Sequence, residues 1–176
     1  DDFTEIGRFG EEVPLPPGAR AAGGGGGRGG GGKGSANPAA RLLPNTGTSI
    51  NGMSPQEYAR SVPPRRGRQA RRIAGEAALR ALYGPGQQGE TFKTQWGGRD
   101  VDLVVRRDGR IYAHESKNFR KKVPVGTHEL KQVLKDWELM QTEQGYTPIW
   151  HFWDAGPTDR LAAVLQEYGI GYIVYK

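Results

Sequence analysis

Apolar residues recur every three to four positions along two stretches of the chain, which is the spacing of one face of an α-helix. The first stretch predicts a helix over residues 69–83 and contains Ala70, Ile73, Ala74, Ala77, Ala78, Ala81 and Leu82. The second predicts a helix over residues 127–144, with the apolar stripe Leu130, Val133, Leu134, Trp137 and Met140. A glycine follows each stretch, as is typical of a helix end, and the same signal predicts a third helix over residues 158–168.

Five shorter runs of apolar and aromatic residues predict strands, over residues 91–96, 101–106, 111–117, 147–153 and 172–175. Asp108-Gly109 lies between the second and third runs and is a strong signal for a tight hairpin turn. The expected order is helix, three strands, helix, strand, helix, strand (α-β-β-β-α-β-α-β). This order predicts an α/β domain with a mixed sheet that is flanked by helices on both faces.

The first third of the chain has a different character. Residues 1–52 are rich in Gly and Pro, so they predict a flexible linker. Ser54-Pro55 is typical of a helix start, so residues 53–64 predict a short helical lead-in, and residues 65–176 form the expected domain. The sequence begins without Met and without a signal peptide, and we therefore expect the rest of a larger polypeptide upstream.

Composition excludes several classes of protein. The chain contains no Cys, which rules out a disulfide scaffold, a Cys-ligated zinc site and thiol catalysis. No run approaches the ~20 apolar residues of a membrane-spanning helix, so no membrane segment is expected.

Charge is unevenly distributed. Residues 1–64 carry six basic and six acidic residues, whereas residues 65–176 carry 19 basic and 13 acidic residues and hold the whole net charge of +6. The basic residues gather in two dense clusters, for which we predict contact with the phosphates of nucleic acid. These predicted contact residues are Arg65, Arg66, Arg68, Arg71, Arg72, Arg120, Lys121 and Lys122. The alternative is that the charge serves solubility alone.

Acidic side chains interrupt two neighbouring predicted strands. Asp102 lies in the strand before the Asp108-Gly109 turn, and Glu115 and Lys117 lie in the strand after it. Pairing about that turn sets Asp102 roughly opposite Glu115, so two carboxylates and an ammonium share one neighbourhood. Two close carboxylates repel unless a proton or cation separates them. The pattern therefore predicts a Mg²⁺ site formed by Asp102, Glu115 and the main-chain carbonyl of Ser116, with Lys117 stabilising negative charge on a phosphate.

The alternative interpretation is a salt-bridged strand pair on a solvent-facing sheet, joining Asp102 to Lys117 or Glu115 to Arg106. The expected position of the strands favours the metal site. Central strands are buried, and unpaired charges on them are costly.

The segments Gly98-Arg99-Asp100-Val101-Asp102-Leu103 and His114-Glu115-Ser116-Lys117 resemble the D…ExK signature of the PD-(D/E)XK, or restriction-endonuclease-like, nuclease superfamily. The resemblance covers about residues 65–176. It implies a restriction-endonuclease-like fold, Asp102 and Glu115 as ligands of Mg²⁺ or Mn²⁺, and Lys117 as the catalytic lysine. Asp100 is a second acidic residue beside the motif, and it leaves open which of the two aspartates is the ligand.

Two further residues resemble elements of that superfamily. Gly75-Glu76-Ala77-Ala78-Leu79 is similar to the first-helix segment of Holliday-junction-resolvase-like members, which implies an active-site role for Glu76. Its alternative role is an exposed ion pair with Arg72 or Arg80. Gln132 resembles a helix glutamine of bacterial toxin nucleases, although its spacing places it away from the apolar stripe, where a solvated polar residue is the alternative.

Taken together, these features predict a Mg²⁺-dependent endonuclease, for which DNA is the preferred substrate and RNA the open alternative. The resemblance to bacterial polymorphic-toxin nuclease domains implies the C-terminal toxin domain of a secreted effector. Such a domain would act in the cytoplasm of a target cell, and we expect an acidic immunity protein as its inhibitor. The alternatives are a housekeeping, Holliday-junction-resolvase-like nuclease and a non-catalytic nucleic-acid-binding module.

Overall fold

The computed structural model describes residue 39 and residues 42–176, and the larger part of the expected linker lies outside this range. The elements follow one another as α1 (Pro55–Arg60), η4 (Pro64–Arg66), α2 (Gly67–Tyr83), β1 (Glu90–Thr94), β2 (Gly97–Val101), β3 (Leu103–Arg107), β4 (Arg110–Lys117), α3 (Thr127–Thr142), β5 (Tyr146–Phe152), α4 (Asp159–Glu167) and β6 (Gly171–Val174).

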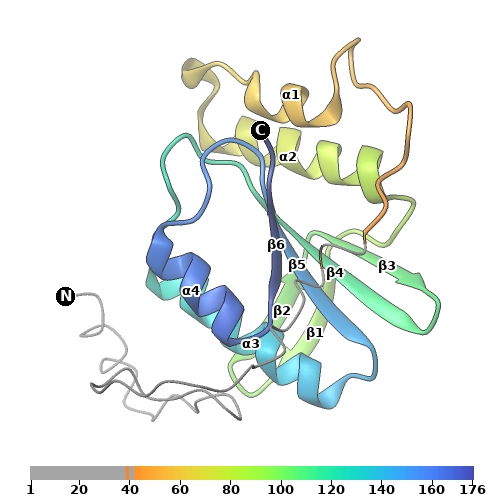
Figure 1. The fold of residues 1–176 in the computed structure, drawn as a ribbon, viewed down its shortest axis with the longest axis vertical. Coiled ribbons are helices and arrows are strands. Elements are labelled where there is room, and N and C mark those ends of the chain that lie inside the picture. The colour runs from red at the N-terminus through yellow and green to blue at the C-terminus, as the bar shows by residue number, and fades with distance from the viewer. Residues whose placement is uncertain (1–38, 40–41) are drawn as a thin grey trace, which may run out of the picture.

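A mixed four-stranded sheet of order β3-β4-β5-β6 forms the centre of the fold (Figure 1). β3 is antiparallel to β4, whereas β4, β5 and β6 run parallel. α2 packs on one face, against Leu103, Val105 and Trp153, and α3 and α4 cover the other face, against Trp150 and Phe152. The predicted α/β class with a mixed sheet and helices on both faces is therefore confirmed.

The strand predicted over residues 101–106 corresponds mainly to β3. An additional strand, β2, forms over residues 97–101, most of which the sequence predicts as a connection. Four strands rather than the predicted three therefore lie between α2 and α3. β2 ends at Val101 and pairs with β1 in a separate two-stranded sheet, while β3 begins at Leu103 in the central sheet. Val101 and Leu103 would share a face in a straight strand, yet they are buried in different apolar clusters. The chain therefore changes direction at Asp102.

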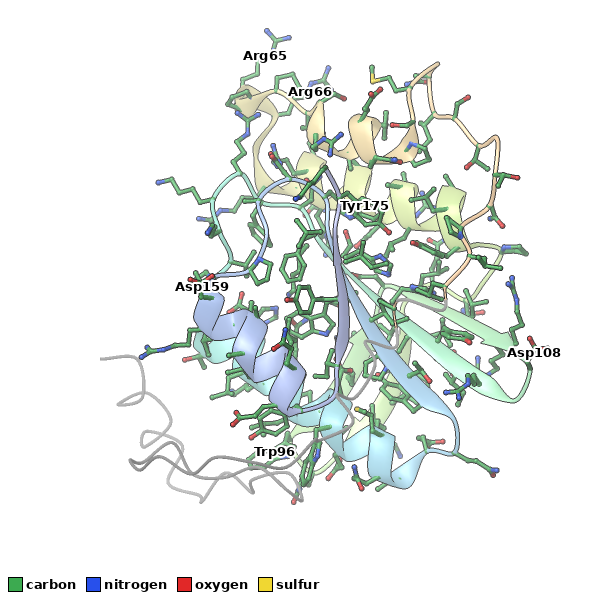
Figure 2. The ribbon with its side chains drawn as sticks, viewed as in Figure 1. Arg65, Arg66, Trp96, Asp108, Asp159 and Tyr175 are labelled. Carbon is green, nitrogen blue, oxygen red and sulfur yellow. The ribbon has the colours of Figure 1, made fainter. Side chains whose placement is uncertain are left out.

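The β3–β4 hairpin turns where the sequence predicts it. Asp108 and Gly109 have φ angles of 52° and 73°, as a two-residue loop of primed type requires. Figure 2 shows Asp108 at the tip of this hairpin. Leu103 pairs with His114 and Arg107 with Arg110, which is the predicted register.

α2 confirms the predicted first helix with one exception. Ala74, Ala78 and Leu82 are buried against the sheet, but Ile73 is 52% exposed. Ile73 follows the exposed Arg72, so it lies at the edge of the apolar stripe rather than within it.

Residues 42–60 pack on the domain. The Asn45 side chain donates hydrogen bonds to the carbonyls of Ala81 and Gly84, at 3.3 and 2.8 Å, and so satisfies the last carbonyls of α2. Ser54 caps α1 as predicted, and Ala59 of α1 is fully buried. The compact unit thus includes α1, before residue 65, and Asn45 of the predicted linker contacts it, while residues 43–49 are exposed. Residues 1–38, 40 and 41 lie outside the described residues.

Within the described part of the chain, the helices are too short or too polar for any of them to span a lipid bilayer.

Candidate active site

The break between β2 and β3 places Asp102 beside the end of β4. Asp102 Oδ2 accepts a hydrogen bond of 2.8 Å from the main-chain N–H of Ser116. The β3–β4 register, continued by one residue, sets Asp102 opposite Glu115, as the sequence predicts. By contrast, the exposed Asp100 accepts a hydrogen bond of 2.5 Å from Thr91 on the neighbouring strand of the β1–β2 hairpin.

Glu115, Lys117 and Gln132 form a buried triangle of polar side chains. Gln132 Nε2 donates to Glu115 Oε1 at 2.7 Å, and Lys117 Nζ donates to Gln132 Oε1 at 2.6 Å. Lys117 Nζ also lies 3.4 Å from Glu115 Oε1 and 4.9 Å from the ring centre of Trp150. The lysine ammonium is therefore held in one position by a carboxylate, an amide and an aromatic face.

The charges around the two buried carboxyl groups give them opposite pKa shifts. For Glu115, burial alone would raise the pKa, but the charges of Arg99 and Lys117 and the hydrogen bond from Gln132 lower it overall. For Asp102, burial and then the negative charge of Glu115 raise the pKa to about 8. At neutral pH the site thus holds a carboxylate on Glu115 and a largely protonated carboxyl on Asp102.

A second buried layer, which the sequence did not reveal, fixes Glu115 from behind. Arg99 Nη1 lies 3.2 Å from Glu115 Oε2, and Arg99 Nε and Nη2 donate to the two oxygens of Asp136 at 2.8 and 3.2 Å. Asp136 also accepts hydrogen bonds from Tyr146 Oη and Trp150 Nε1 and is fully buried. The sequence does contain a signal for the burial of Asp136. Gln132, Asp136 and Leu139 are spaced i, i+4 and i+7, so they share one face of the helix.

The structure shows the surroundings of Gln132 and Glu76, the two further residues that the sequence singled out. Gln132 is buried, so its solvated alternative is wrong, because the face of α3 that carries it packs against the end of β4. Glu76 lies near enough to Asp102 to contribute to the raised pKa of that group. Glu76 Oε1 also lies 3.8 Å from Arg72 Nε, which is the ion pair predicted as its alternative role.

The proposed strand-pair salt bridges do not form as the alternative interpretation required. Arg106 pairs with Glu90 across the β1 and β3 segments, at 2.5 Å, rather than with Glu115. Glu115 and Lys117 are 6% and 3% exposed, so they do not lie on a solvent-facing sheet.

A groove with a volume of about 960 Å³ opens above this cluster, and Asp102, Glu115, Lys117 and Gln132 line it. Five exposed cationic side chains also line the groove, namely Arg68, Arg72, Arg120, Lys121 and Lys122. Asp100 and Glu129 line the groove as well, so cationic side chains outnumber acidic ones around a floor that contains two carboxyl groups and one ammonium group.

Arg71, predicted as a surface cation, is instead buried. Its guanidinium donates to the carbonyl and side chain of Asn118 and to Asp154 Oδ2, at 3.1, 3.1 and 2.7 Å. Because a helix turns by 100° per residue, Arg71 and Arg72 point to different sides of α2. Arg65 and Arg66 do not line the groove, and Figure 2 shows them at the end of the molecule beside α1.

Gly75 allows α2 to approach the end of β4 closely. A Cβ atom at this position would lie 2.4 Å from Ser116 Oγ and 3.1 Å from the Trp153 ring. Ser116 Oγ cannot move away freely, because it accepts a hydrogen bond of 2.9 Å from Trp153 Nε1.

We therefore expect Gly75→Ala to lower the free energy of unfolding by about 1–3 kcal/mol, the usual cost of overpacking. Urea unfolding measures this loss. Ser116→Ala removes the closest clash but also the acceptor of Trp153 Nε1, so Gly75→Ala should cost less when it is added to Ser116→Ala than when it is added to the parent. Equal stability of Gly75→Ala and the parent would contradict the close approach.

The raised pKa of Asp102 predicts a pH-dependent stability in the absence of metal. The unfolded carboxyl loses its proton near pH 4 and the folded one near pH 8, so its contribution to stability falls as the pH rises through this window and is constant above it. We expect Asp102→Asn to gain about 1–3 kcal/mol over the parent at pH 8 and little at pH 4.

The comparison of parent and variant isolates Asp102 from other titrating groups. Burial lowers the pKa of His114 to about 4, which opposes the trend at acidic pH in both proteins alike. Thermal unfolding in EDTA at pH 4 and pH 8 measures the difference between parent and variant, and a pH-independent difference would contradict the shifted pKa.

Within the described residues, no three or more His, Cys, Asp or Glu side chains gather in a group suited to a metal ion. A metal at this site would rest on two carboxyl groups, a main-chain carbonyl and water. Comparisons with protein-family models, with curated proteins and with solved structures find no match to this chain.

Proposed function

We propose that this protein is a Mg²⁺- or Mn²⁺-dependent endonuclease that hydrolyses phosphodiester bonds of DNA, with a restriction-endonuclease-like fold. We further propose that it is the C-terminal toxin domain of a larger secreted bacterial polypeptide and acts in the cytoplasm of a target cell. One observation carries the enzymatic part of the proposal. Asp102, Glu115, Lys117 and Gln132 converge on the floor of a groove that is lined by more cationic than acidic side chains.

The carboxyl groups fit a hard divalent cation. The mutual repulsion of Asp102 and Glu115 contributes to the pKa of about 8 at Asp102, and a cation between them would relieve it. A carboxylate has about four acceptor positions. Glu115 accepts hydrogen bonds from Arg99 and Gln132 and so retains acceptor capacity. Mg²⁺ commonly uses one or two carboxylates and keeps several waters, which suits Asp102, Glu115 and the carbonyl of Ser116.

The bound metal would supply Lewis-acid stabilisation of phosphate charge and activation of the attacking water. The chain's own residues would supply the rest. Lys117 presents a fixed ammonium beside the carboxylates, where it would stabilise the negative charge that develops on the phosphate. Gln132 holds Lys117 and Glu115 at a constant separation, and the groove cations would orient the strand.

Incubation of the 176-residue chain with supercoiled plasmid DNA and with RNA, in Mg²⁺, Mn²⁺ or EDTA, tests the proposal. We expect nicking and linearisation of DNA with either metal and none in EDTA. Binding without cleavage under every condition would favour a non-catalytic nucleic-acid-binding module. Cleavage of RNA alone would retain the chemistry but overturn the choice of substrate.

We also propose an acidic immunity protein that covers the cationic walls of the groove. For a co-encoded candidate, we expect affinity to fall as salt rises, because exposed charges are screened beyond ~10 Å at 0.1 M salt. Lys121→Glu/Lys122→Glu should weaken binding at least about tenfold at low salt, since it places like charges opposite one another. Lys93→Glu, an exposed change outside the groove, is the control. Unchanged affinity across salt and variants would contradict the charge-based interface.

A further inference from the structure

Phe119 exposes an aromatic ring inside the cationic groove. The side chain is 41% exposed, lines the groove, and directly precedes Arg120, Lys121 and Lys122. Single exposed apolar residues are ordinary on protein surfaces. The position of this ring is distinctive, because it combines a flat apolar face with cations that would hold a phosphate backbone.

The backbone that carries Phe119 is fixed on both sides. Before it, Asn118 is buried and donates to the carbonyls of Ala59 and Arg71, at 2.7 and 2.8 Å. At Phe119 itself, the carbonyl accepts a hydrogen bond of 3.0 Å from the N–H of Ala155. After it, Arg120 Nη2 donates to the carbonyl of Val62 at 2.6 Å.

The loop that follows is also tied down. Val123 N–H donates to the carbonyl of Gly156, and Thr158 N–H donates to the carbonyl of Val123. Figure 1 shows this loop between β4 and α3 running beside the loop between β5 and α4. The aromatic ring is thus presented on a rigid frame, which lowers the entropic cost of stacking a ligand on it.

We propose that Phe119 stacks on an unpaired nucleobase of the substrate, so that the groove takes a single strand or a locally opened duplex. This inference rests on the proposed nuclease function. Bases inside an intact duplex are stacked on one another and offer only their edges, whereas an unpaired base offers its face. Phosphates on either side of that base would meet the groove cations.

Binding of the full chain to fluorescent oligonucleotides in EDTA tests the proposal without cleavage. The probes are a single DNA strand, the duplex of the same sequence and the matching RNA strand. We expect the parent to prefer a single strand over the duplex, and Phe119→Ala to weaken single-strand binding by roughly 5- to 100-fold. Duplex binding should change by less than about twofold, because the cations that hold the backbone remain.

Two conservative variants separate stacking from apolar contact. Phe119→Trp should bind a single strand as tightly as the parent, whereas Phe119→Leu, which keeps an apolar side chain without a ring, should bind as weakly as Phe119→Ala. Leu43→Ala is the control, because Leu43 is 83% exposed and does not line the groove. If the Phe119 variants bind the RNA strand with the same order of affinities, stacking on an unpaired base is supported for RNA as well.

The outcomes distinguish this inference from the proposed function. A parent that binds none of the probes in EDTA would overturn the stacking role, whereas the plasmid assay with Mg²⁺ or Mn²⁺ decides the proposed nuclease function separately. A parent that binds and cleaves nucleic acid but does not prefer single strands, or whose affinity is unchanged in Phe119→Ala, would overturn only the stacking role. Equal affinity of Phe119→Leu and Phe119→Trp for the single strand would also overturn the stacking role, because a ring would then be unnecessary.

Discussion

Replacing Lys117 with methionine should lower the rate of nucleic-acid cleavage by roughly two to three orders of magnitude, the usual effect of removing one fixed donor that stabilises transition-state charge. Methionine keeps an unbranched apolar side chain but lacks the ammonium that bonds Gln132, lies beside Glu115 and faces the Trp150 ring. Glu115 keeps Arg99 as a partner, so its negative charge stays compensated in the folded state.

Single-turnover cleavage of plasmid DNA in Mg²⁺ measures this effect, and thermal unfolding checks that the variant is folded. Lys93→Met is the matched control, because Lys93 is exposed on β1 and does not line the groove. A rate for Lys117→Met within about threefold of the parent would remove Lys117 from the proposed chemistry. The companion variant Asp102→Asn should lose cleavage to a similar extent while gaining stability in EDTA at pH 8, which separates lost chemistry from lost folding.

Asp136→Ala should produce the largest loss of stability, about 3–5 kcal/mol, which is typical when one partner of a buried ion pair is removed. Asp136 accepts hydrogen bonds from Arg99, Tyr146 and Trp150 and is fully buried. Its removal leaves the guanidinium with Glu115 as its one charged partner, beside the carbonyl of Asp100, and leaves two aromatic donors without this acceptor.

Urea unfolding of the metal-free protein measures the loss. Glu143→Ala, which removes an exposed acid at the end of α3, is the control and should change stability by less than about 0.5 kcal/mol. A loss for Asp136→Ala no larger than that of the control would show that the Arg99–Asp136 pair does not hold the site together. Because Arg99 also orients Glu115, residual cleavage by any folded Asp136→Ala protein should be reduced as well.

The local part of the fold was predictable from the sequence because it depends on local rules. Helix periodicity, the Ser54 cap and the Asp108-Gly109 turn each depend on residues close together in the chain. The turn also sets the β3–β4 register, and side chains alternate along a strand. The proximity of Asp102 to Glu115 therefore follows from a few neighbouring residues.

Errors arose where burial depends on distant elements. The break at Asp102 depends on Val101 and Leu103 packing into different apolar clusters. The residues that form those clusters come from distant segments, so the sequence of residues 101–106 alone does not show the break. Arg71 resembles Arg72 in sequence, yet only Arg71 is enclosed by Asn118 and Asp154 from other segments. Residues 42–52 look like a linker in composition, but Asn45 meets the end of α2.

The sequence by itself determined the order of most elements, the basic character of the domain and the meeting of Asp102, Glu115 and Lys117. Only the tertiary structure decided that Gln132 joins them and that Arg99 and Asp136 support Glu115 from behind. The physical reason is that a polar residue on a helix face is solvated or buried according to what packs against it. The buried face of α3 packs against the end of β4. There Gln132 bonds Lys117, which lies 15 residues earlier in the chain, so the pattern of the helix alone does not record the contact.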